Sequence, residues 1–149
     1  KIQSDLVASL PFKEVSMSDY IKLIGTPFVD GGRDPQIGLD CYGLLMEVFQ
    51  GFGIMIPEYF APALNDQAVS DQVEKVRTVA WKEVDKGNLP VPSVVLLRFN
   101  SPLCNHVGAY IGNGRFIHCR NPIGVNIDRI DSPAWRHRIE GFYILDEGE

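Results

Sequence analysis

The spacing of apolar residues changes near Pro92 and divides the chain into two halves. Before this point apolar side chains recur every three or four residues, which predicts amphipathic helices. After it they form short runs bounded by Gly, Asn and Pro, which predict about five strands. These runs are VVLLRF (94–99), HVGAYIG (106–112), RFIHC (115–119), GVNIDRI (124–130) and EGFYILD (140–146). Helices followed by antiparallel strands indicate an α+β fold, with the helices packed on a sheet.

Three helices are expected in the first half of the chain. They are a short helix between Ser16 and Gly25 with Ser16 or Ser18 before it, a second from Asp40 to Gln50 or Phe52, and a third from Val69 to Lys86. Asp40 has a side chain suited to the N-cap, and glycines follow the second helix, where they commonly end helices. The Gly- and Pro-rich segment 25–39 predicts an ordered loop before this helix.

Length and composition favour one domain, which we expect to span residues 1–149. A domain of this size buries roughly two-thirds of the surface that its unfolded chain exposes. The formal charge is -5 and the basic residues are scattered, so nucleic acid is not an expected partner. No apolar run approaches the roughly 20 residues of a membrane span, and the first residues do not have the pattern of a signal peptide. We therefore expect no membrane span.

The cysteines point to chemistry rather than to a disulfide framework. There are three, Cys41, Cys104 and Cys119, and an odd, sparse set cannot staple a domain of this length. Cys41 falls in the first turn of the second helix, where the helix dipole and free N–H groups favour a thiolate. The thiolate is the nucleophilic form of cysteine. The alternative is a buried cysteine that acts as a small apolar side chain.

Two histidines begin and end neighbouring strands. Alternation along 106–112 and 115–119 places His106 and His118 on one face only if the turn between the strands contains three residues or a bulge. In that register His118 lies opposite Gly108 and diagonal to His106, within reach of its side chain. One imidazole can then orient the other.

Cys41, His106 and His118 together match the needs of thiol catalysis, which are a nucleophile, a base and a group that fixes the tautomer of the base. A zinc site made from Cys104, His106, His118 and Cys119 is the competing interpretation. It is disfavoured because adjacent residues of a strand point to opposite faces. His137 lies in a basic stretch and is expected on the surface.

Four segments also carry a resemblance to a known family. They are IGTPFVDGG (24–32), DCYGL (40–44), HVGAYIG (106–112) and FIH (116–118). In this order they resemble the glycine-rich lead-in, the nucleophile motif, the base strand and the third-residue strand of the NlpC-type cell-wall cysteine peptidases. The resemblance extends from Tyr20 to Tyr143.

The resemblance implies a circularly rearranged papain-like fold and hydrolysis of peptide stems in bacterial peptidoglycan, commonly between D-glutamate and diaminopimelate. It implies neither a metal nor a cofactor. By this resemblance Cys41 is the nucleophile, His106 the base and His118 the orienting group of a Cys-His-His triad.

Three further residues are expected to contact substrate. Asp40 is similar to a family residue beside the substrate cleft, although its N-cap role explains it equally well. Tyr42 follows the nucleophile where secreted members of the family usually carry serine. Phe28 stands where the family usually has tyrosine, so a hydroxyl that could assist the oxyanion or contact substrate is missing.

Some details resemble a branch of the family found in phage tail proteins, namely residues 29–35 (VDGGRDP), Tyr42, Trp135-Arg136 and residues 140–143 (EGFY). The branch implies an enzyme on a virion tail, or one made in the bacterial cytoplasm without a signal peptide, that acts at the cell wall. Other tail proteins would then be its partners. The alternative is a tail-assembly or wall-binding module that keeps the fold without the chemistry. Papain-like folds also host amidases and acyl transferases.

Overall fold

The computed structural model describes residues 20–59, 61–62 and 64–146. The capping residues expected for the first helix, Ser16 and Ser18, lie outside these ranges. Tyr20 and Ile21 are helical, and the following turn reaches Gly25, whose φ of 91° suits glycine. In this described part no helix has both the length and the apolar character needed to cross a bilayer.

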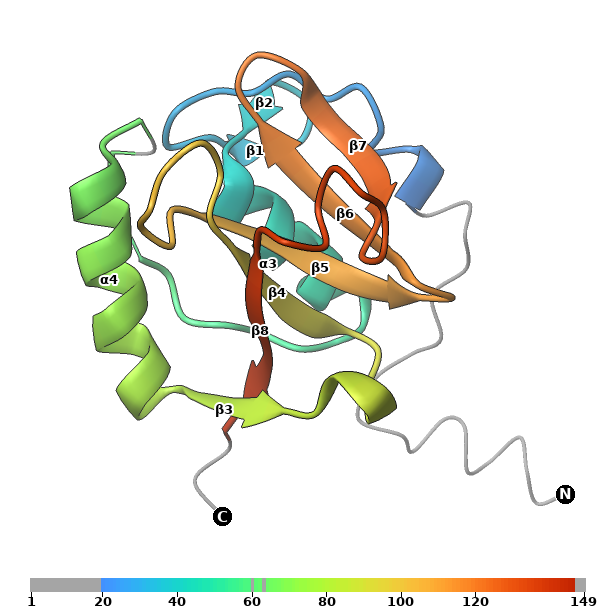
Figure 1. The fold of residues 1–149 in the computed structure, drawn as a ribbon. Helices are drawn as coiled ribbons and strands as arrows, with labels where there is room; N and C mark the ends of the chain where they lie inside the picture. The colour runs from blue at the N-terminus through green and yellow to red at the C-terminus, as the bar shows by residue number, and fades with distance from the viewer. Residues whose placement is uncertain (1–19, 60, 63, 147–149) are drawn as a thin grey trace, which may run out of the picture.

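A six-stranded antiparallel sheet forms the centre of the fold (Figure 1). Its strands lie in the order β3-β8-β4-β5-β6-β7. Their bounds are β3 Trp81–Val84, β4 Ser93–Leu97, β5 His106–Gly112, β6 Arg115–Arg120, β7 Gly124–Arg129 and β8 Ile139–Leu145. Five of these strands occupy the runs predicted from the sequence. The expected loop 25–39 also contains a two-stranded hairpin, β1 Arg33–Asp34 and β2 Gly38–Leu39.

The second predicted helix is confirmed as α3, which spans Cys41–Gly51 with Asp40 at its N-cap. Its apolar residues at three- and four-residue spacing are buried: Leu44, Leu45, Val48 and Phe49. Such side chains each contribute about 1.5–3 kcal/mol when fully buried. This face packs mainly on β5 and β6.

The third predicted helix is shorter than expected, and its predicted end at Lys86 is wrong. The helix α4 spans Asp66–Val79, and Asn65 caps it by accepting a hydrogen bond from the Ala68 amide at 3.0 Å. Residues 81–84 instead form β3, which pairs with β8. A short 3-10 helix, η1 Lys86–Asn88, follows. The apolar spacing fits either structure, and pairing with a strand far along the chain decides between them.

The turn between β5 and β6 contains the bulge that the sequence requires. Residues 112–114 all have positive φ, and the register shifts between Tyr110 and Gly112. As a result His118 lies opposite Gly108, as predicted. A Cβ on Gly108 would lie 3.0 Å from the His118 Cβ, so glycine leaves the space that the imidazole needs.

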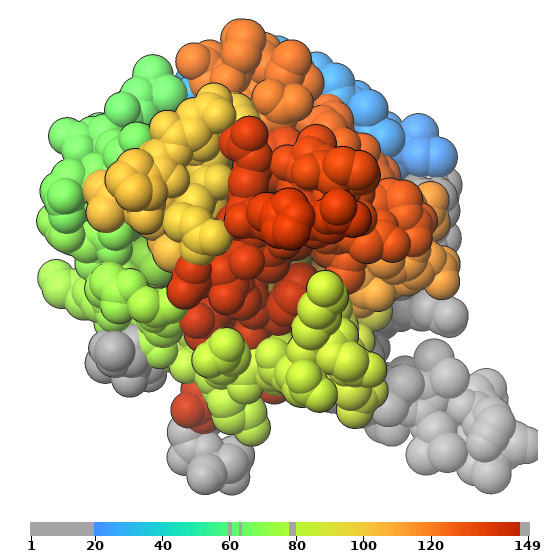
Figure 2. All heavy atoms as spheres, viewed as in Figure 1, coloured from blue at the N-terminus to red at the C-terminus, as the bar shows by residue number. Residues whose placement is uncertain are grey.

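The sheet separates two apolar clusters. On one face α3 packs against Val107, Ala109 and Ile117. On the other face a second cluster consists of Val95, Leu97, Phe116, Ile130, Trp135 and Phe142. Trp135 comes from the segment between β7 and β8, which crosses the near side of the sheet in Figure 1, with α3 behind. Figure 2 shows the atoms of this segment at the centre of the near face. Both faces are therefore covered, and the side chains of β5 and β6 alternate between two interiors.

Candidate active site

Cys41 is the first residue of α3 and is partly exposed. Its thiol receives backbone hydrogen bonds from Val107 and Tyr42. Val107 directly follows His106, so the sulfur lies at the beginning of β5. Gly43 allows the loop before α3 to pack against the helix, because a Cβ there would lie 2.1 Å from the Gly32 carbonyl oxygen. Packing therefore requires glycine at this position, two residues after Cys41.

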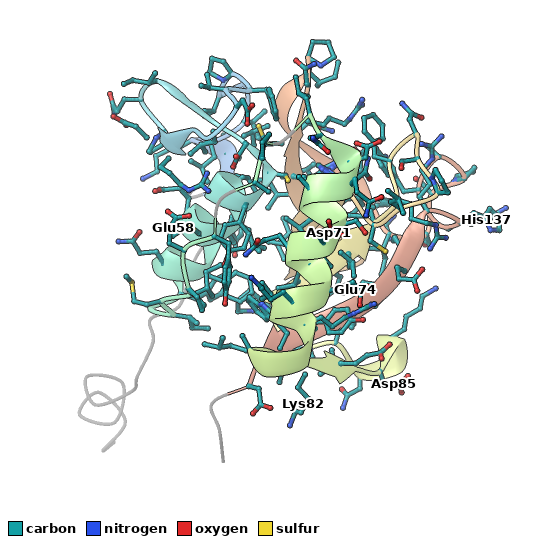
Figure 3. The ribbon with its side chains drawn as sticks, turned by 90° about the vertical axis from the view of Figure 1, so that its left-hand side faces the viewer. Glu58, Asp71, Glu74, Lys82, Asp85 and His137 are labelled. Carbon is teal, nitrogen blue, oxygen red and sulfur yellow. The ribbon has the colours of Figure 1, made fainter. Side chains whose placement is uncertain are left out.

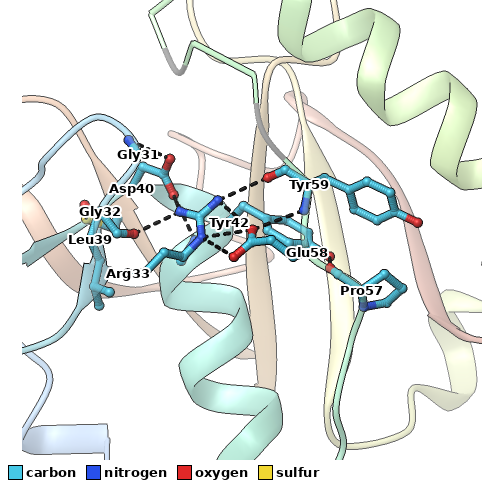
Figure 4. A network of polar contacts seen from close by, with 11 residues as sticks. Gly31, Gly32, Arg33, Leu39, Asp40, Tyr42, Pro57, Glu58 and Tyr59 are labelled. Atoms are coloured by element: carbon cyan, nitrogen blue, oxygen red, sulfur yellow. Dashed lines mark hydrogen bonds and ion pairs between the residues drawn. The ribbon is translucent and has the colours of Figure 1, made fainter.

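Asp40 is buried, and both of its carboxylate oxygens accept hydrogen bonds from the protein (Figure 4). Its Oδ1 accepts hydrogen bonds from the Gly43 amide at 2.8 Å and from Arg33 Nη1 at 2.7 Å. Its Oδ2 accepts one from the Gly31 amide at 3.0 Å. The N-cap interpretation is confirmed, and Asp40 joins the glycine-rich loop to α3. Contact with substrate stays a prediction.

Residues 57–59 lie across the beginning of α3 and are held by two side chains (Figure 4). Arg33 donates to both carboxylate oxygens of Glu58 at 3.0 Å and to the Tyr59 carbonyl at 3.0 Å. The Tyr42 hydroxyl donates to the Pro57 carbonyl. Tyr42 therefore anchors this segment with its hydroxyl.

A cavity of about 100 Å³ lies between α3, α4 and the sheet, and Cys41 is on its wall. Figure 3 shows the two helices beside each other, with Asp71 and Glu74 on α4. Asp40 and Tyr42 also line the cavity, and the rest of its wall is mostly apolar. Phe28 does not line it and packs against the core on the α3 face. The structure thus brings two of the three predicted substrate residues beside the thiol.

The two imidazoles share a face and are hydrogen-bonded, as the predicted register requires. His106 Nε2 lies 2.8 Å from His118 Nδ1, and both residues are buried. His118 Nε2 lies 2.8 Å from Asp128 Oδ2 on β7. Asn126 Nδ2 donates to the same oxygen at 2.8 Å. A continuous chain of hydrogen bonds therefore runs from Asp128 to His106.

This chain fixes the tautomer of each histidine. A carboxylate only accepts hydrogen bonds, so His118 carries its proton on Nε2 and presents Nδ1 as an acceptor. His106 must then donate from Nε2. Its Nδ1 is left without a proton and is the atom able to act as a base. The roles predicted for His106 as base and His118 as orienting group require this order of donors and acceptors, and the roles themselves stay predictions.

Asp128 was not predicted from the sequence as a site residue. It extends the predicted pair of histidines to a chain of three side chains, because His118 is itself oriented by a carboxylate. The signal was available in the run GVNIDRI, since Asn126 and Asp128 are two residues apart and share one strand face. What the sequence did not reveal is the β6–β7 register, in which His118 pairs with Asn126 and Phe116 with Asp128.

Burial sets the resting protonation state of the site. It raises the pKa of the Cys41 thiol to about 12, and the negative charge of Asp40 adds to this effect. Burial also lowers the pKa of His106 well below its usual 6.5, with further lowering by His118 and Arg120. The expectation that the helix start makes Cys41 a thiolate is therefore wrong for the free protein. At neutral pH the Cys41 thiol is therefore protonated and the His106 imidazole is neutral.

We expect Asp128→Asn to lower kcat by about 10²-fold and to move the acid limb of kcat/KM to lower pH. Burial lowers the pKa of His118, whereas the hydrogen bond and charge of Asp128 raise it. Removing the carboxylate therefore lowers the pKa of His118 further, so a smaller fraction of this imidazole is protonated at a given acidic pH. The wild-type limb is itself expected below pH 6.5, because both imidazole pKa values are lowered. A pH–rate profile of peptide hydrolysis measures both effects.

Asp131→Asn is the matched control for this variant. Asp131 is exposed, three residues further along the chain, and pairs with Arg129 at 3.1 Å. Its profile should overlay that of the wild type. An acid limb that moves to higher pH in Asp128→Asn, or an unchanged kcat, would contradict the role of the carboxylate.

The geometry excludes the zinc site made from Cys104, His106, His118 and Cys119. Cys119 hydrogen-bonds through Sγ to the Leu39 carbonyl at 3.2 Å, in the core on the α3 face. His118 points to the opposite face, so the two cannot bind one ion. Among the described residues there is no group of three or more His, Cys, Asp or Glu side chains placed to hold a metal. His137 is exposed at the periphery, as expected (Figure 3).

Two bacterial proteins are similar in sequence to most of this chain. The bifunctional muramidase/DL-endopeptidase CwlT of Bacillus subtilis (strain 168) is 28% identical over 134 residues, which is 90% of this chain and 37% of CwlT. Murein DD-endopeptidase MepS/Murein LD-carboxypeptidase of Escherichia coli (strain K12) is 30% identical over 135 residues, which is 90% of this chain and 63% of that protein. The chain thus spans less than two-thirds of the length of either relative.

Solved structures agree with the fold. A Staphylococcus aureus protein described as similar to lipoprotein, NLP/P60 family, has a TM-score of 0.61 and 22% identity, and the match covers 95% of this chain and 46% of that one. The NlpC/p60 domain of peptidoglycan hydrolase SagA has a TM-score of 0.57 and 23% identity, with 86% and 93% covered. These neighbours confirm the predicted papain-like α+β fold.

A family model gives the assignment. The model of the NlpC/P60 family matches residues 25–143, a range that includes α3 with Cys41, both histidine strands and Asp128. Because this match covers most of the chain, the protein belongs to the NlpC/P60 family.

Proposed function

We propose that this chain is a cysteine endopeptidase that hydrolyses peptide stems of bacterial peptidoglycan, at the bond between D-glutamate and diaminopimelate. The observation that carries the proposal is the series of hydrogen bonds from Asp128 through His118 to His106, which leaves His106 Nδ1 able to accept a proton. His106 is the first residue of β5 and directly precedes Val107, whose backbone amide donates a hydrogen bond to the Cys41 thiol. The names of CwlT and MepS, both endopeptidases, support the same reaction class.

In the first step Cys41 Sγ attacks the scissile carbonyl carbon while His106 Nδ1 takes the thiol proton. The positive end of the α3 dipole lies at Cys41 and stabilises the oxyanion that forms. His106 then gives its proton to the leaving amine, and a thioester of Cys41 remains. Water, deprotonated by His106, attacks the thioester carbon, and the thiol regains its proton as the acid product leaves.

The protonation state of the resting site determines when charge appears. Since the thiol is protonated and the imidazole neutral in the free protein, the ion pair forms only as the sulfur attacks. Asp128 then stabilises the imidazolium through His118. This assigns Asp128 and His118 to positioning and electrostatic support, and His106 to proton transfer.

Digestion of purified muropeptides followed by mass spectrometry tests the proposal. A cut between D-glutamate and diaminopimelate gives a disaccharide dipeptide and a free diaminopimelyl peptide. A cut at the amide joining sugar and stem, or an acyl transfer product, would assign the protein to another reaction of this fold. Absence of any cleavage would overturn the proposal.

A second candidate is a wall-binding or tail-assembly module that does not use the chemistry. The raised pKa of Cys41 favours it, because a protonated thiol is a poor nucleophile. Cys41→Ala would then leave function intact. Placement on a phage tail, with tail proteins as partners, is a narrower form of either candidate. It is supported by the resemblance of residues 29–35, Tyr42, Trp135-Arg136 and residues 140–143.

A further inference from the structure

A cluster of aromatic rings and guanidinium groups lies on the sheet face that carries the histidines. Phe99 and Trp135 are stacked, with ring centroids 5.8 Å apart. The Arg120 guanidinium carbon lies 5.4 Å from the Phe99 centroid and 5.5 Å from that of Trp135. Arg138 lies 5.9 Å and 5.8 Å from the same two rings. We call these four residues the Arg120 cluster.

The Arg120 cluster touches the hydrogen-bonded histidines directly. The Trp135 ring packs edge-on against His118, with centroids 4.9 Å apart, and Phe99 lies 5.9 Å from His106. Arg120 is two residues beyond His118 on the same face of β6, so their backbones are about 7 Å apart. The intervening Cys119 points to the opposite face of β6, where its Sγ donates to the Leu39 carbonyl. The cluster therefore borders the histidine pair, which includes the proposed base.

The Arg120 guanidinium packs against the rings of Phe99 and Trp135. A guanidinium has five N–H donors in its plane, which are suited to a carboxylate. Arg120 Nε is buried and has no hydrogen-bond partner among the described residues. Asn126 Oδ1, on the same sheet face, is also buried and unpartnered. By contrast, Arg138 donates to Asn100 Oδ1 at 3.0 Å, and Arg98 pairs with Glu140.

The charge of Arg120 acts on the titrating groups of the site. Asp128 is the carboxylate that feels this charge, but its Oδ2 already accepts from His118 and Asn126. The positive charge also opposes catalysis in the free protein: after burial, it contributes to the lowered pKa of both His106 and His118. An anion bound at Arg120 would remove this penalty and make the base stronger only when the site is filled.

We propose that Arg120 binds a free carboxylate of the substrate next to the scissile bond. The inference rests on the proposed function, which supplies a peptide stem as substrate. Two such groups flank the proposed cut, the α-carboxylate of D-glutamate linked through its side chain and the carboxylate of diaminopimelate outside the peptide chain. Both offer the same chemistry to a guanidinium edge, and the experiment separates them.

The test compares synthetic stem peptides that differ in one group, carboxylate or carboxamide, first at the glutamyl residue and then at diaminopimelate. For the wild type we expect kcat/KM to fall roughly 10- to 100-fold on amidation at one of the two positions, since hydrogen bonds to charged groups have this magnitude. In Arg120→Gln the ratio of acid to amide should approach one. Arg120→Lys should keep part of the preference, because the charge remains.

Arg115→Gln is the matched control, since Arg115 is on the same strand but on the opposite face by alternation. Its acid-to-amide ratio should equal that of the wild type. A wild-type ratio near one in both peptide pairs, or a ratio that Arg120→Gln leaves unchanged, overturns the inference while hydrolysis still supports the proposed function. The ratio is measured within each variant, so a general loss of stability does not imitate the expected result.

A binding measurement tests the carboxylate site independently of hydrolysis. Calorimetry of the same peptides with Cys41→Ala should give tighter binding of the acid form, and the double variant Cys41→Ala/Arg120→Gln should lose this difference. Equal binding of acid and amide to Cys41→Ala would overturn the carboxylate site even if peptides are cut. A preference in binding without any cleavage by the wild type would keep the site and reject the peptidase.

Discussion

Cys41→Ala should lower kcat for stem-peptide hydrolysis by about 10⁴-fold or more, with the fold intact. The thiol is the group that attacks the peptide bond in the proposed mechanism, and loss of this nucleophile costs nearly the whole chemical contribution of a catalytic set. The substitution is small and the side chain is at a helix start on a cavity wall, so little packing is lost. Initial rates with a synthetic stem peptide measure the effect, and circular dichroism verifies the fold.

Cys104→Ala is the matched control for this result. Cys104 is also partly exposed and free, but it does not line the cavity. Its activity should stay within a few-fold of the wild type. Iodoacetamide gives an independent check, since alkylation of Cys41 should abolish activity and proceed faster as pH rises toward about 12. A Cys41→Ala variant that keeps a tenth of the activity would show that another group attacks the substrate.

The local parts of the fold could be predicted because they depend on neighbouring residues. The helix at Asp40, the bulge before Arg115 and the shared face of the histidines follow from capping, turn residues and alternation. The strand at 81–84 could not be predicted, since its spacing fits a helix and its partner β8 lies about 60 residues away in the chain. Its order in the sheet is likewise a tertiary property.

The chemical state of the site was harder to predict than its composition. The first turn of a helix favours a thiolate, and this local argument pointed to a low pKa for Cys41. The sequence does not show how far the fold buries the sulfur, and burial is the largest cause of the raised pKa, followed by the charge of Asp40. Asp128 and Arg120 were missed for a related reason, because their proximity to His118 depends on the register of β6 with β7 and on the position of Trp135.

His106→Ala should reduce hydrolysis nearly as much as Cys41→Ala, by about 10⁴-fold, and His118→Asn should cost far less. His106 Nδ1 is the single proton acceptor in the mechanism, and no side chain in the chain of hydrogen bonds can replace it at the thiol. His118 must offer only an acceptor to His106 Nε2 and a donor toward Asp128, and an amide has both. Rates of acylation measured in single-turnover experiments distinguish loss of the base from loss of binding.

His137→Ala controls for removal of an imidazole, because His137 is exposed and away from the cavity. It should retain full activity. Since the Cys41 thiol is protonated in the free protein, His106→Ala should leave its alkylation at pH 7 within about tenfold of the wild type while hydrolysis collapses. A parallel collapse of both rates would mean that His106 holds Cys41 as a preformed thiolate, and the order of proton transfer given above would then have to be reversed.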